Sequence, residues 1–293
     1  MNEIVILSGK GGTGKTSLIA CFTMLAEGSL VIADCDVDGP DLHFLLKPQV
    51  QEKHEFLASK MASMASIDLE LCSRCGLCSE HCRFEAIADN FTVDGLACEG
   101  CGLCAHVCTE CAISMEDVVS GHWFRSITRC GPMVHARLGF GEANSGKLVS
   151  KVRQESRYLA EHVGADLIMV DGPPGIGCPV IASLAGASLA VIVTEPSISG
   201  LHDLERVLDV CLHFDIPAAV CVNRYDLDVD FSHRIQSLTR QRNLVFLGRV
   251  PYDPGVTRAM VHGQTVVEYG RGPAAEGIRQ LWSGIQSLIS GLH

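Results

Sequence analysis

Residues 8–16 read Ser-Gly-Lys-Gly-Gly-Thr-Gly-Lys-Thr, a glycine-rich segment that decides the fold of the chain. The apolar run Ile4–Leu7 precedes it, and a helix-compatible segment, Ser17–Leu25, follows it. A strand, a glycine loop and a helix in this order match the phosphate-binding loop, whose pattern G-x-x-x-x-G-K-T fits Gly9–Thr16 without a gap. We therefore expect this stretch to bind the phosphates of a nucleotide.

Each residue type in this loop has a task in phosphate binding. Glycines allow backbone N–H groups to close around the phosphates, and the positive end of the following helix adds to the attraction. Lys15 can reach the β- and γ-phosphates, and the Thr16 hydroxyl can ligate Mg²⁺. The residues of the loop expected to contact the nucleotide are Gly11, Gly12, Thr13, Gly14, Lys15, Thr16 and Ser17.

Length and composition restrict the class of protein. The 293 residues allow one large α/β domain or two domains, and a hydrophobic content of 47% is ample for a core. Because no apolar stretch is long enough to span a membrane and the first residues already form a strand, we expect no signal peptide and a cytoplasmic location. Fifteen cysteines in such a chain indicate metal ligands rather than disulfides.

The acidic charge is concentrated in one segment. Between Ile67 and Asp117, ten acidic and two basic residues contribute −8 of the formal net charge of −11. Such a surface disfavours nucleic acid and suits a basic protein partner, although ordinary solubilising charge explains it equally well.

The order of apolar segments predicts the architecture. After an expected strand at 30–34 and a connecting segment at 47–66, strands and helices alternate from about residue 167 to residue 250. This βαβ rhythm predicts a doubly wound, mostly parallel α/β sheet with helices on both faces. The simplest organisation is one nucleotide-binding domain, residues 1–66 and 117–293, interrupted by a small α+β insert at 67–116.

The insert contains the internal repeat of the sequence. Both copies share the pattern C-x-x-C-G-L-C-x-x-x-C, and this spacing is the signature of bacterial ferredoxins with two [4Fe–4S] clusters. The fourth cysteine of each run then binds the other cluster, which assigns one cluster to Cys72, Cys75, Cys78 and Cys108 and the other to Cys98, Cys101, Cys104 and Cys82. Paired zinc sites also use C-x-x-C, but zinc does not require this doubled four-cysteine run. Cys111, just beyond the second run, is interpreted as a small buried residue in preference to a spare ligand.

Lys10 lies beside the first glycine of the loop. The resulting G-K-G-G-T-G-K-T resembles the deviant phosphate-binding loop of the ATPases of the MinD/ParA/Mrp and nitrogenase-iron-protein superfamily. The resemblance implies Mg²⁺-dependent ATP hydrolysis and a nucleotide-dependent homodimer, in which Lys10 reaches the phosphates of the partner subunit.

Four further motifs resemble the same superfamily. Asp34-x-Asp36 resembles its first switch, with Asp36 as the water-orienting or base residue and Asp34 near the metal. Asp171 leaves a buried strand, which suits outer-sphere binding of Mg²⁺, and Gly172–Gly175 resembles the second switch. The remaining motifs imply adenine contacts by Asn223, Arg224, Pro251 and Asp253.

From end to end, the chain resembles superfamily members with an inserted two-cluster ferredoxin domain. This resemblance implies an iron–sulfur ATPase that couples dimer closure to the ferredoxin module, for redox gating or sensing. It also implies a redox or metal-cofactor protein as partner. One alternative is an Mrp-type scaffold or carrier for iron–sulfur clusters or metal cofactors. Such relatives hold a bridging cluster on a C-P-x-C pair, but here Ile181 stands where the second cysteine would follow Cys178-Pro179.

A second alternative is a MinD-like positioning or partitioning ATPase. MinD binds membrane through a C-terminal amphipathic helix, and residues 274–292 are amphipathic here. They carry one Arg and no Lys, so attraction to anionic lipid is weak and we expect this helix to pack on the sheet.

Overall fold

The computed structural model describes residues 1–57, 63–139 and 145–291. It divides into two compact units, a large one of Met1–Lys53, Trp123–Arg137 and Ser145–His293, and a small one of His54–His122 and Leu138–Asn144. The small unit has wider bounds than the insert expected at 67–116, because it takes in a strand pair from Ser63 to Asp117 and the adjoining ends of three longer strands.

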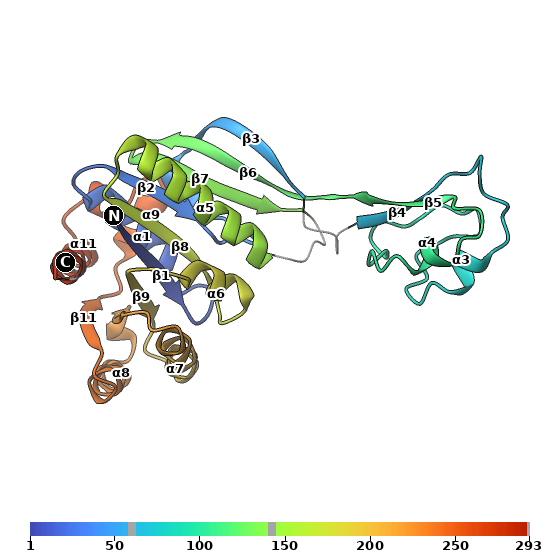
Figure 1. Cartoon of the computed structure of the whole chain (residues 1–293). Coiled ribbons are helices and arrows are strands. Elements are labelled where there is room, and N and C mark those ends of the chain that lie inside the picture. The colour runs from blue at the N-terminus through green and yellow to red at the C-terminus, as the bar shows by residue number, and fades with distance from the viewer. Residues whose placement is uncertain (58–62, 140–144, 292–293) are drawn as a thin grey trace. The chain divides into compact units, whose positions relative to one another are not determined.

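A nine-stranded sheet forms the centre of the large unit, in the order β11-β10-β9-β1-β8-β2-β7-β6-β3 (Figure 1). Its strands are β1 (Asn2–Ser8), β2 (Leu30–Asp34), β3 (Gln49–Leu57), β6 (Val119–Thr128), β7 (Gly131–Leu138), β8 (Leu167–Pro174), β9 (Leu189–Thr194), β10 (Ala218–Asn223) and β11 (Val245–Val250). From β11 to β7 every neighbouring pair is parallel, which confirms the expected mostly parallel α/β sheet. Only two residues join β6 to β7, a connection typical of an antiparallel hairpin.

Helices cover both faces of this sheet. They are α1 (Lys15–Leu25), α2 (Leu42–Leu46), α5 (Ser145–Val163), α6 (Cys178–Leu184), α7 (Ile198–His213), α8 (Val229–Gln241), α9 (Pro254–Val261), α10 (Val266–Tyr269) and α11 (Pro273–Ser290), with a 3₁₀ turn at Tyr225–Leu227. Ile4 and Ile6 of β1 share one core cluster with residues of α1 and α11. Since side chains alternate along a strand, Val5 and Leu7 face the opposite layer, where α5, α6 and α7 pack on the sheet (Figure 1).

The C-terminal helix α11 packs on the sheet, as expected. Ile278, Leu281, Trp282 and Ile285 are buried, and the Trp282 ring stacks on Phe22 of α1 with 5.7 Å between the ring centroids. In the part of the chain that the structure describes, no helix combines the length and the apolar character needed to cross a membrane.

The connecting segment expected at 47–66 contains two strands, so that expectation is wrong. β3 occupies the edge of the sheet, and its side chains are mostly exposed on both faces. A strand exposed in this way has no apolar alternation for sequence analysis to detect.

The small unit is built around the antiparallel pair β4 (Ser63–Ile67) and β5 (Ile113–Asp117). Two short helices, α3 (Leu77–Glu80) and α4 (Leu103–Val107), lie within the cysteine runs, and each contains the third cysteine of its run. The glycines that precede them, Gly76 and Gly102, have φ of 81° and 73°, which explains the glycine shared by both repeats. The core of the small unit contains Ala65, Cys78, Ile87 and Ile113, with further cysteines packed against them.

Candidate nucleotide site and cysteine-lined pockets

The glycine loop connects the carboxyl end of β1 to the first turn of α1. Gly12 and Gly14 have φ of 81° and 87°, the left-handed region that favours glycine. A Cβ at Gly14 would lie 2.4 Å from Nδ2 of Asn223, so a side chain there would clash as well as strain the backbone. Asn223 Nδ2 also donates a hydrogen bond of 2.8 Å to the carbonyl oxygen of Thr13, which fixes the end of β10 against the loop.

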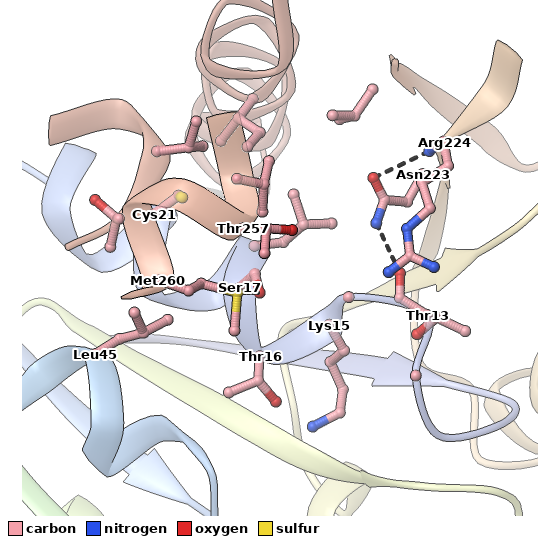
Figure 2. A pocket seen from close by; sticks show the side chains of 18 of the residues that line it. Thr13, Lys15, Thr16, Ser17, Cys21, Leu45, Asn223, Arg224, Thr257 and Met260 are labelled. Carbon is pink, nitrogen blue, oxygen red and sulfur yellow. Dashed lines mark hydrogen bonds between the residues drawn. The ribbon is translucent and has the colours of Figure 1, made fainter. Parts of the chain in front are cut away.

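A cleft of about 600 Å³ opens beside this loop (Figure 2). It is lined by most of the residues predicted to contact nucleotide or Mg²⁺: Gly11, Gly12, Thr13, Gly14, Lys15, Thr16, Ser17, Asp36, Asn223, Arg224, Pro251 and Asp253. Segments far apart in the sequence thus meet in one cavity. Two other predicted residues, Lys10 and Asp171, are not in its lining, and their contacts are described separately.

Buried charges gather at the phosphate end of the cleft. The Lys15 ammonium, 5% exposed, pairs with Asp171 and lies 3.5 Å from Oδ2 of Asp36. Burial opposes the charge of Lys15, but Asp171, Asp36 and Asp34 outweigh it and hold the pKa of Lys15 above its ordinary value. Burial, reinforced by Asp171, raises the pKa of Asp34 well above its usual range and also raises that of Asp36.

Two carboxylate oxygens in this corner accept no hydrogen bond from the described residues. Asp34 and Asp171 are register partners on β2 and β8, and Oδ2 of each is buried without a hydrogen-bond partner among the described residues. Buried acceptors of this kind carry an energetic cost unless a cation or water satisfies them. With the Thr16 hydroxyl at the cleft wall, the donor set consists of oxygen atoms and fits Mg²⁺.

The base-binding candidates follow β10 and β11, and Asn223 and Arg224 lie directly beside the glycine loop. Arg224 adopts a left-handed backbone with φ of 53°, and its amide N–H donates to the Asn223 side chain at 3.1 Å (Figure 2). Asp253 caps α9, because its Oδ1 accepts the Gly255 N–H at 2.7 Å. The Asp253 carboxylate therefore shapes the loop in addition to lining the cleft.

Lys10 points along the protein surface to the N-terminal end of α7. Its Nζ lies 2.6 Å from Oε1 of Glu195 and 2.9 Å from Oγ of Ser199. Sequence analysis did not identify Glu195 or Ser199, because nothing in the sequence indicates that the segment after β9 lies against the glycine loop.

The eight repeat cysteines divide between two small pockets of the small unit. One pocket is lined by Cys72, Cys75, Cys78 and Cys108. The other is lined by Cys82, Cys98, Cys101 and Cys104. The fourth cysteine of each run thus lines the pocket of the other run.

These pockets are small, about 20 Å³ each. Within the described ranges, no group of three or more His, Cys, Asp or Glu side chains could hold a single metal ion. In a cubane cluster each thiolate binds a different iron, so the four sulfur atoms surround the cluster, and the donor set fits this arrangement.

The other cysteines lie outside these pockets. Cys21, Cys35, Cys211 and Cys221 are buried in the large unit, and Cys130 is partly buried there. Cys111 is exposed and has φ of 51°, so the prediction of a buried Cys111 is wrong. It occupies a tight turn after the second run, where its N–H donates to the Cys108 carbonyl. Cys178 is exposed at the start of α6.

The profile of the CobQ/CobB/MinD/ParA nucleotide-binding domain matches residues 4–266. The chain belongs to this family. The expected superfamily and the mostly parallel α/β fold are thereby confirmed. MinD of Pyrococcus furiosus, a cell division ATPase, has a similar structure, with a TM-score of 0.58 and 19% identity over 98% of this chain and 99% of that chain. At this identity the likeness shows the fold alone.

Two relatives show how far sequence similarity extends in this MinD/ParA-type chain. An uncharacterised protein of Methanocaldococcus jannaschii is 27% identical over 98% of this chain and 97% of its own length. An iron-sulfur cluster carrier protein of Pyrococcus abyssi is 24% identical over 46% of this chain and 50% of its own. The first alignment spans nearly the whole chain, whereas the second spans less than half of it.

Proposed function

We propose that this protein is a Mg²⁺-dependent ATPase that closes as a homodimer on ATP and carries two resident [4Fe–4S] clusters in its small unit. The observation that carries the proposal is the division of eight cysteines between two pockets, in the crossed arrangement of two-cluster ferredoxins. Membership of a nucleotide-binding family and the carboxylate corner beside Lys15 support the ATPase part.

Thr16, Asp34 and Asp171 would hold the magnesium ion, which neutralises phosphate charge and orients the γ-phosphate. Lys15 leaves Asp171 to contact the β- and γ-phosphates. Asp36 lies on the cleft wall, and its raised pKa makes its carboxylate a better proton acceptor for the attacking water. Water oxygen then bonds to the γ-phosphorus, the bond to the bridging oxygen breaks, and ADP leaves with that oxygen.

The small unit would supply one-electron chemistry when its clusters are bound. Its acidic composition suits a basic redox or metal-cofactor protein as partner. Closure and reopening of the ATPase would then gate electron transfer, or the redox state would control hydrolysis.

Cluster carriage is the second candidate. Its support is the partial similarity to the carrier protein of Pyrococcus abyssi and the exposed thiol of Cys178. A bridging cluster needs two ligands from each subunit, and the side chain three residues on is Ile181.

Iron content and ATPase rate, measured on the same anaerobically purified samples, test the proposal. We expect about eight irons per wild-type chain. Cys75→Ser and Cys101→Ser, each removing one ligand from a different pocket, should each lose about half of the iron. Lys15→Ala should keep the iron and abolish hydrolysis, because the phosphates lose their buried cation.

Cys178→Ser is the matched control, since it removes an exposed cysteine outside both pockets. Unchanged iron in this variant supports two resident clusters. Iron lost from Cys178→Ser but not from Cys75→Ser or Cys101→Ser would replace the proposal by a bridging, carried cluster.

A further inference from the structure

Lys10 is already engaged within its own subunit. The Glu195 carboxylate lies 2.6 Å from Lys10, and both side chains are partly exposed, at 20% and 33% respectively. Among the described residues, Glu195 is the carboxylate within ion-pair distance of Lys10, and its second oxygen lies 3.9 Å from the Arg224 guanidinium. One acidic side chain therefore lies between two cations expected to contact nucleotide.

We propose that Glu195 is a positioning residue that holds Lys10 in the free subunit and releases it only to a nucleotide bound by the partner. This inference rests on the proposed role of Lys10 in the dimer. Lys10 would contact two different anions in the two states. In the free subunit it binds the single charge of a carboxylate, and in the closed dimer it binds phosphate oxygens.

The surroundings of Lys10 favour release. α7 begins at Ile198 with Ser197 as its cap, so the positive end of this helix faces the ammonium group. Ser199 gives Lys10 a neutral hydrogen-bond acceptor only. Glu195 is thus the main attraction, and in a partly exposed pair it is modest and reversible.

The exchange explains a dependence on the γ-phosphate. Freeing Lys10 from Glu195 costs the same whichever nucleotide is bound. ATP offers an additional charged phosphate in return and ADP does not. Glu195 therefore raises the threshold for closure, which ATP exceeds and ADP does not.

Two measurements on the full chain test this role. Reductive methylation, read by mass spectrometry in the absence of nucleotide, reports how freely the Lys10 amine reacts, and we expect it to be several-fold faster in Glu195→Gln. Sedimentation equilibrium with Mg²⁺ and a non-hydrolysable ATP analogue reports the dimer dissociation constant. Two exposed ion pairs break per dimer, so Glu195→Gln should lower that constant about 2- to 30-fold. With ADP, the same variant should form dimer at concentrations where the wild type stays monomeric.

Glu205→Gln is the matched control, because it removes an equal charge from α7 at a residue paired with Arg242. It should leave both measurements unchanged, whereas Glu195→Asp should restore slow Lys10 labelling. Equal labelling of Lys10 in the wild type and in folded Glu195→Gln would overturn the role of Glu195. Dimerisation that persists in Lys10→Ala would instead overturn the proposed dimer mechanism and leave the labelling result intact.

Discussion

Three aspartates and one lysine share the buried corner of the large unit at the phosphate end of the cleft. Asp34 and Asp171 are almost completely buried, and Lys15 is the cation that compensates for them. A folded protein tolerates such a cluster at a cost in stability, because buried like charges lie close together. With a cation and a triphosphate bound, the buried carboxylates would ligate the cation and Lys15 would contact the phosphates.

Asp34→Asn should stabilise the nucleotide-free protein while it impairs Mg²⁺-dependent hydrolysis. Because burial and Asp171 raise the pKa of Asp34 above 3.8, the folded state binds this proton more tightly than the unfolded state does. The stability from that proton is complete at low pH and is lost as pH rises toward the folded-state pKa. The stability difference between Asp34→Asn and wild type should therefore grow as pH rises above about 4. Each kcal/mol of that difference raises the Tm of the variant by about 2–4 °C.

Thermal unfolding of the wild type and Asp34→Asn across this pH range, without Mg²⁺, measures the effect. The exposed Asp38 supplies the matched control, and Asp38→Asn should shift Tm little at any pH. A lower Tm for Asp34→Asn than for wild type at pH 7 would contradict the prediction.

At the scale of elements, local patterns predicted what local forces determine. The glycine loop, β2 and the amphipathic α11 follow from residue type and spacing, and the structure contains each of them. β3 was not predicted because an exposed edge strand has no apolar periodicity, and its position depends on its pairing with β6. The contact of Lys10 with Glu195 was not predicted for a related reason. The two residues are 185 positions apart in the sequence, and only the folded sheet brings them together.

Leu281→Ala tests whether α11 is part of the core. Leu281 is 1% exposed and packs in the cluster that includes Phe22 of α1, so its truncation leaves a cavity. We expect a loss of about 2–5 kcal/mol in the free energy of unfolding, measured in urea. Ser283→Ala, on the exposed side of the same helix, should change it by less than about 0.5 kcal/mol. Equal losses in the two variants would show that this face of α11 contributes no core packing.

At the scale of the whole molecule, the nucleotide site and the small unit are successive parts of one chain. The segment that carries Asp34 and Asp36 continues into α2, whose Phe44 and Leu45 line the cleft, and then into β3. β3 leads directly into the small unit, and β6 returns from it to the sheet. A shift of α2 on nucleotide binding would therefore act on the strand that enters the small unit.

This continuity predicts that the redox state of the small unit alters hydrolysis. The steady-state ATPase rate of cluster-loaded protein should differ several-fold between its reduced and oxidised forms. Reduction adds negative charge to the small unit, and β3 and β6 connect that unit to the sheet that carries the nucleotide site. The double variant Cys75→Ser, Cys101→Ser is the control, since it lacks a ligand for each cluster and its rate should be independent of reductant. Equal rates for reduced and oxidised wild type would contradict coupling within this chain, and control of hydrolysis would then have to come from a bound partner.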